Sequence, residues 1–70
     1  MANSITIFGK TINVVRKTAY KVIARNVHNG ELFTIIHKCG VYELHYPFGG
    51  GMVIKDKKEA WKAFLKLVTE

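Results

Sequence analysis

The sequence predicts an α+β fold, an antiparallel β-meander with one C-terminal α-helix packed on one face. Two runs rich in β-branched and aromatic residues flank the pair Asn29-Gly30, and apolar residues recur at helical spacing over 57–69. An Asn-Gly pair between such runs is the strongest short-range hairpin signal, because both central residues of a type I′ turn need positive φ. We therefore expect three strands over 20–46, extended by an N-terminal strand or hairpin.

Length and composition indicate one small domain. The 70 residues are 49% hydrophobic, so the chain carries enough apolar side chains to offset the entropy lost on folding. Cys39 is the single cysteine, which leaves packing rather than an internal disulfide to hold the domain together. The expected segments of the domain 1–70 are an N-terminal strand or hairpin at 1–19, the meander at 20–46, a glycine-rich loop at 47–55 and the helix at 56–69.

The charge balance favours anionic partners. Eleven Lys or Arg against five Asp or Glu give a formal net charge of +6, and such a field attracts phosphate backbones, acidic protein patches or anionic lipids. No apolar run approaches the roughly 18 residues of a membrane span, and residues 1–8 lack the features of a signal peptide. We expect a cytoplasmic protein with no membrane partner.

The N-terminal segment reads as two short strands, 4–8 and 11–16, around Gly9-Lys10. A Gly-X pair suits a type II′ turn. The alternative is one bent strand with a bulge at Gly9, because an isolated glycine in a strand often marks such a kink.

Two-residue turns at Asn29-Gly30 and Cys39-Gly40 fix which side chains share a face of the meander. The first turn places Val22 opposite His37. The predicted core face then holds Tyr20, Val22, Ala24, Phe33, Ile35, His37, Tyr42, Leu44 and Tyr46. The opposite face holds Lys21, Ile23, Arg25, Val27, Leu32, Thr34, Ile36, Lys38, Val41, Glu43 and His45. A one-residue slip would exchange the two faces.

The C-terminal segment predicts a helix from Lys57 to about Thr69. Asp56 is the expected N-cap, with Glu59 three residues later as in a capping box. The expected apolar stripe is Ala60, Trp61, Phe64, Leu65 and Val68, and a row of lysines, Lys58, Lys62 and Lys66, follows the other side. We expect Trp61 and Phe64 to pack over the core face of the meander.

Catalytic and metal-binding chemistry is not indicated. Cys39 and His37 lack the third group and the cleft that a nucleophile needs. One cysteine and three histidines do not form the paired short spacings of a zinc site. We expect no enzyme activity, no metal and no cofactor.

The mixed face is the candidate binding site, because cations gather there among aliphatic side chains. The candidate nucleic-acid-binding residues are Lys21, Arg25, Lys38, His45, Arg16 and Lys17. Strands can read nucleic acid with basic and polar side chains, and phosphate contacts supply most of the affinity. Aromatic side chains fall on the core face, which disfavours recognition by base stacking. The aliphatic residues of the mixed face are expected to be covered either by the N-terminal hairpin or by another chain.

These features predict a small basic binding module, with a nucleic-acid-binding accessory protein as the leading hypothesis. The alternatives are a protein-interaction module that binds an acidic partner, such as a small inhibitor or adaptor encoded by a phage or mobile element, and a homodimer through the aliphatic sheet face. The order of three antiparallel strands and a helix over 20–69 is similar in architecture to small three-stranded-sheet DNA-binding domains, such as those of integrase amino-terminal arms.

Overall fold

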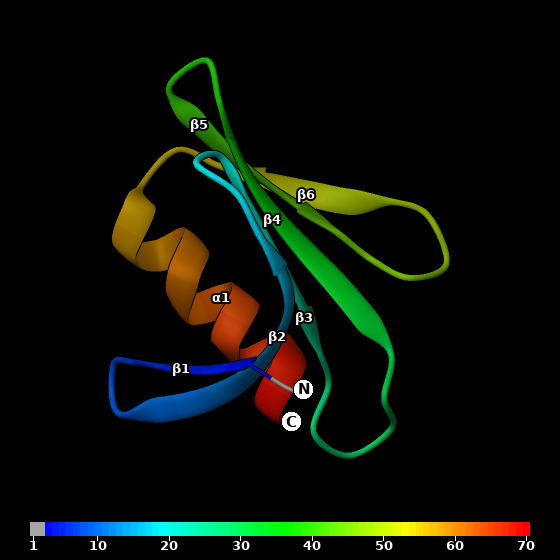
Figure 1. Cartoon of the computed structure of the whole chain (residues 1–70). Coiled ribbons are helices and arrows are strands. Elements are labelled where there is room, and N and C mark those ends of the chain that lie inside the picture. The colour runs from blue at the N-terminus through cyan, green and yellow to red at the C-terminus, as the bar shows by residue number, and fades with distance from the viewer. Residues whose placement is uncertain (1–2) are drawn as a thin grey trace.

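The computed structural model describes residues 3–70, which form one sheet and one helix (Figure 1). The elements are β1 (Asn3–Ile7), β2 (Lys10–Lys17), β3 (Lys21–Arg25), β4 (Leu32–Lys38), β5 (Val41–His45), β6 (Gly51–Ile54) and α1 (Lys57–Thr69). All neighbouring strands are antiparallel, and their order in the sheet follows the chain. The predicted α+β class is confirmed. The sheet, however, has six strands rather than three with an extension, because β2 pairs with β3 and β6 pairs with β5.

The N-terminal hairpin turns at Phe8-Gly9. Ile7 pairs with Lys10 across these two residues. Phe8 and Gly9 have φ angles of 52° and 77°, positive at both central positions as a type I′ turn requires. The predicted turn at Gly9-Lys10 is therefore wrong by one residue, and the alternative of a single bent strand is wrong as well.

This hairpin extends the sheet instead of folding over its outer face. A bulge between Val14 and Arg16 interrupts the ladder of β2 with β3. Ile12 and Val14 lie under the helix and are buried, because their alternation places both on one face of a paired strand. Of the two alternatives for covering the aliphatic residues of the mixed face, cover by the N-terminal hairpin is therefore wrong.

The hairpin between β3 and β4 has a longer loop than the sequence predicts. A two-residue turn at Asn29-Gly30 would place Val22 opposite His37, whereas Val22 lies opposite Ile35. The register is thus displaced by two residues. A displacement of two preserves the alternation of side chains, so the predicted division into two faces survives the error.

Asn26 accounts for the longer loop. Its N–H donates to the carbonyl of Glu31 at 2.7 Å, which makes 26–31 a closed loop. Its side chain is buried and accepts the N–H groups of His28 and Asn29 at 2.7 and 3.0 Å. The loop also contacts three carbonyls at the end of α1. Asn26 Nδ2 donates to the carbonyl of Leu67 at 2.7 Å, and the N–H of Val27 donates to the carbonyl of Val68 at 2.9 Å. His28 Nε2 lies 3.1 Å from the carbonyl oxygen of Thr69. Carbonyls of a last helical turn lack partners inside the helix, and this loop supplies them.

The turn between β4 and β5 is the predicted one. Cys39 and Gly40 have φ angles of 51° and 77°, and Leu44 lies opposite Ile35 as expected. Both residues of the turn are exposed. This hairpin supplies the two central residues of the core face.

The segment after β5 ends the sheet. β5 stops at His45, before Pro47, as predicted, because proline cannot donate to a ladder. The glycine-rich loop then reverses the chain into β6. Gly51 is required there, because a Cβ at this position would collide with the backbone carbonyl of Leu44.

The helix has the predicted bounds and cap. The carboxylate of Asp56 accepts the N–H of Glu59 at 2.9 Å. Within residues 3–70, no helix is long and apolar enough to span a bilayer.

The core lies between α1 and the sheet, as predicted. The buried apolar side chains are Ile12, Val14, Val22, Ala24, Ile35, Leu44, Ala60, Phe64, Leu65 and Val68. Phe64 is fully buried, and burial of a side chain of this size contributes about 1.5–3 kcal/mol. Two members of the predicted core face are nevertheless exposed, Tyr20 and His37. Both lie at the end of the sheet beside the first turn of the helix.

Candidate nucleic-acid interface

The sheet face opposite α1 is uncovered by residues 3–70, and we call it the open face. The register determines its members. They are Ser4 and Thr6 of β1, Thr11, Asn13 and Arg16 of β2, Lys21, Ile23 and Arg25 of β3, Leu32, Thr34, Ile36 and Lys38 of β4, Val41, Glu43 and His45 of β5, and Val53 of β6. The mixed face that the sequence predicts is therefore real, and β1, β2 and β6 enlarge it.

Five of the six predicted site residues share the open face: Arg16, Lys21, Arg25, Lys38 and His45. Lys17 does not. The bulge after Val14 adds one residue to β2, so Lys17 pairs with the buried Val22 and belongs to the helix side of the sheet. The sequence offered no signal for this bulge, because Val15 continues a β-branched run without a glycine.

The open face carries more positive than negative charge. Glu43 is its one acidic side chain, and its Oε1 lies 3.1 Å from His45 Nε2. The guanidinium of Arg25 donates to the carbonyl of Gly30 at 3.0 Å, a bond that leaves its positive charge uncompensated. Four permanent cations thus face a single carboxylate.

Aliphatic side chains separate these charges. Across the strands, Lys21 pairs with Ile36, Ile36 with Glu43, and Glu43 with Val53. Ile36 is half-buried between its neighbours, whereas Val53 on the last strand is 63% exposed. Charged and apolar positions therefore alternate across this row of the face, which is not a continuous basic patch.

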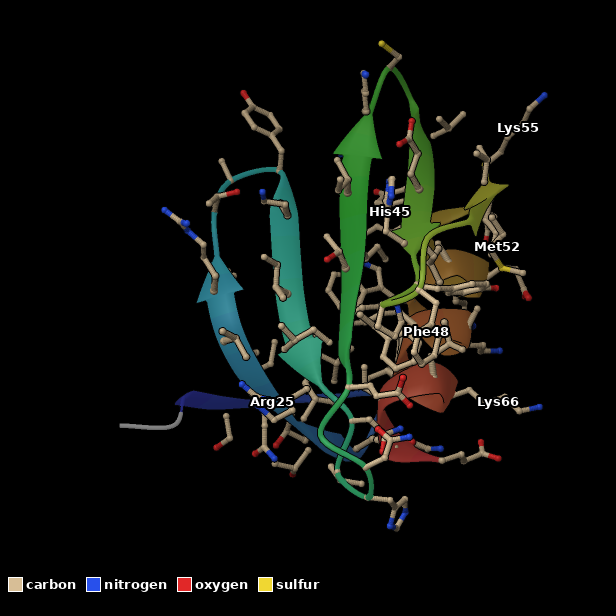
Figure 2. All side chains as sticks on the ribbon, turned by 90° about the vertical axis from the view of Figure 1, so that its right-hand side faces the viewer. Arg25, His45, Phe48, Met52, Lys55 and Lys66 are labelled. Atoms are coloured by element: carbon tan, nitrogen blue, oxygen red, sulfur yellow. The ribbon has the colours of Figure 1, made fainter. Side chains whose placement is uncertain are left out.

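The lysine row of the helix forms a separate surface. Lys58, Lys62 and Lys66 are exposed on the side of α1 that faces away from the sheet. Figure 2 shows Arg25 and His45 on the strands and Lys66 extending outward from the helix. The two sets of cations point apart, with the sheet and the core between them.

A cleft of about 220 Å³ lies at the end of the sheet where α1 begins. It was not predicted, because alternation assigned its aromatic residues to the core. Its walls come from the connection between β2 and β3, from the facing ends of β4 and β5, and from the first turns of α1. The side chains that matter chemically are Lys17, Tyr20, Tyr42, Lys57 and Trp61.

The histidines and the cysteine are dispersed over the fold. His37 stacks on Tyr42, His45 contacts Glu43 and His28 contacts the end of the helix. Among residues 3–70, no three His, Cys, Asp or Glu side chains are grouped so that they could hold a metal ion.

Comparison with models of protein families, with curated proteins and with solved structures finds no significant match to this chain. The architectural likeness to three-stranded DNA-binding domains also weakens, because the sheet has six strands.

Proposed function

We propose that this protein is a small nucleic-acid-binding accessory protein that docks through its open face. The observation that carries the proposal is the uncovered sheet face with Arg16, Lys21, Arg25 and Lys38 against the single carboxylate of Glu43. Cations on a solvent-accessible face displace the counterions of a phosphate backbone, and this release drives non-specific binding.

The spacing of the cations supports contact with several phosphates of one strand. The register places Arg25, Arg16, Lys21 and Lys38 at successive open-face positions along the strands. Each lies two residues, or about 6.6 Å, from the next, so the four cations extend over about 20 Å. Phosphates of one DNA strand recur about every 3.4 Å along the helix axis. Hydroxyl and amide side chains add donors to phosphate oxygens on the β1 and β2 side of the face, among them Thr6, Thr11 and Asn13.

Fluorescence anisotropy with a short labelled DNA duplex tests the proposal. Between about 50 and 200 mM salt, the logarithm of the affinity is expected to fall with a slope of about −3 to −4 against the logarithm of salt concentration, as for four phosphate contacts. The triple variant Arg16→Ala, Arg25→Ala and Lys38→Ala is expected to reduce this slope to about −1.

The matched control is the triple variant Lys58→Ala, Lys62→Ala and Lys66→Ala, which removes the same charge from the helix. It is expected to retain most of the affinity and most of the slope. Equal losses in the two triple variants would show that net charge rather than the open face attracts the duplex. An absence of binding at low salt would refute the proposal.

The aliphatic members of the open face favour a second candidate function, a protein-interaction module for an acidic partner. Ile23, Ile36 and Val41 lie between the cations and are accessible in part, and interfaces bury such apolar positions inside a polar rim. A defined partner that survives nuclease treatment in a pull-down, with no affinity for the duplex, would favour this candidate. A dimer that resists dilution in sedimentation would instead identify self-association through the same face.

A further inference from the structure

The cleft at the start of α1 combines aromatic walls with cations. Tyr20, Tyr42 and Trp61 contribute rings, Lys17, Lys21 and Lys57 contribute charge, and none of the residues 3–70 that line the cleft is acidic. Its floor is apolar, made by the buried Val22 and Ile35. An apolar floor with rings and cations around it suits a ligand that is flat, aromatic and negatively charged.

The cleft holds one stacked pair of rings and two further rings that are accessible at least in part. Tyr42 and His37 lie parallel, with ring centroids 4.4 Å apart and an interplanar angle of 8°, which shows that flat groups already stack at this end of the sheet. Tyr20 is 71% exposed and has no place in the core. Trp61 is half-buried, and the ring of Phe64 lies edge-on to it, with the ring centroids 5.5 Å apart. A nucleobase offers a π-face that stacks on such rings whatever its sequence identity.

The turn that carries Tyr20 is held in place before any ligand arrives. The hydroxyl of Thr18 accepts the N–H groups of Tyr20 and Lys21 at 3.4 and 3.1 Å. The carbonyl of Tyr20 accepts the N–H of His37 at 2.8 Å. An aromatic side chain on a fixed turn loses little backbone entropy when it contacts a ligand.

Charge at the cleft continues from the open face. Lys21 belongs to the open face by register and also lines the cleft. Lys17 and Lys57 stand on the helix side, and Lys57 is the first residue of α1. A phosphate backbone that lies on the open face can therefore reach the cleft without leaving a cationic surface.

We propose that this cleft takes up one unpaired nucleotide of a nucleic acid bound at the open face. The base stacks on Tyr20 and Trp61, and the adjacent phosphate contacts Lys17 and Lys57. The volume of about 220 Å³ lies below the roughly 300–1,000 Å³ of sites that enclose drug-sized ligands, so one base enters while the phosphate stays at the rim. This inference rests on the proposed function and specifies its target as a strand with an unpaired base.

Trp61 is the single tryptophan of the chain and reports on the cleft directly. The probes are a single-stranded DNA oligonucleotide and the blunt duplex of the same sequence. The single strand is expected to quench Trp61 fluorescence and to bind about tenfold more tightly than the duplex, the size of one base–aromatic stacking contact.

Tyr20→Ala separates the cleft from the open face. This variant is expected to lose the tenfold preference for the single strand while its duplex affinity and salt slope stay unchanged. The matched control is Phe48→Ala, which removes a side chain that is 87% exposed on the loop at the other end of β5. Phe48→Ala is expected to keep both the preference and the quenching.

The outcomes distinguish the two proposals. Equal affinity for single strand and duplex, with Tyr20→Ala indistinguishable from the unchanged protein, would overturn the cleft and leave the open face standing. A loss of preference in both Tyr20→Ala and Phe48→Ala would also overturn it. If neither the single strand nor the duplex binds at low salt, both proposals are overturned together.

Discussion

The two ends of α1 meet the rest of the protein in different ways. At the C-terminal end, the loop 26–31 supplies partners to the last helical carbonyls, with Asn26 buried at its centre. At the N-terminal end, Asp56 caps the helix from within the same segment, and among residues 3–70 no hydrogen bond joins the first turn to the sheet. One end is tied and the other is left accessible. The C-terminal end fixes the position of the helix, whereas the N-terminal end borders the accessible cleft.

The largest effect is expected at the tied end. Asn26→Leu removes the donor to the carbonyl of Leu67 and the acceptor for two loop N–H groups, and leaves those three backbone groups without these partners. At about 1 kcal/mol for each hydrogen bond, the free energy of unfolding is expected to fall by about 3 kcal/mol. Urea denaturation followed by circular dichroism measures this change.

The control for this change is Asn29→Ala, which removes one exposed side-chain bond to the N–H of Glu31. We expect a loss of about 1 kcal/mol or less. If both variants lost the same stability, Asn26 would not be what ties the loop to the helix.

A smaller effect is expected at the other end. Asp56→Ala removes the side chain that accepts the N–H of Glu59, and loss of an N-cap typically costs about 1 kcal/mol. Asp56→Asn keeps an acceptor of the same shape and is expected to retain most of the stability. Thermal unfolding measures the stability of both Asp56 variants. If Asp56→Ala lost as much stability as Asn26→Leu, the two ends of α1 would contribute equally to the stability of the fold.

The smallest effect is expected for Tyr20→Ala. A side chain that is 71% exposed contributes little to packing, and surface substitutions usually change stability by less than about 0.5 kcal/mol. The turn itself keeps its bonds, because they use the hydroxyl of Thr18 and backbone atoms. Urea denaturation checks this, and a loss above about 1 kcal/mol would mean that Tyr20 supports the fold rather than an accessible cleft.

Features that depend on local pattern were predictable from the sequence. Asp56 and the stripe that includes Phe64 determine the helix and its buried side, and the structure confirms both. The two faces of the meander were also correct, since the error of two residues in the first register leaves alternation intact. Cys39-Gly40 turned as expected because glycine favours positive φ.

Features that depend on distant contacts were not predictable. The side chain of Asn26 bonds to a carbonyl 41 residues away, and nothing near Asn26 in the sequence indicates that partner. The bulge after Val14, which removes Lys17 from the open face, likewise carries no glycine signal. The cleft was missed for a related reason: alternation gives the face of Tyr20, but it does not say how far along the sheet the helix reaches.

The order of elements along the chain leaves the sheet without its cover until the last element is made. All six strands precede α1, and Ile12, Val22 and Ile35 belong to the same core cluster as the buried side chains of that helix. Until α1 has folded onto the sheet, the strands expose apolar side chains and unpaired edges that can associate with other chains. Completion of the fold therefore waits for the C-terminal helix.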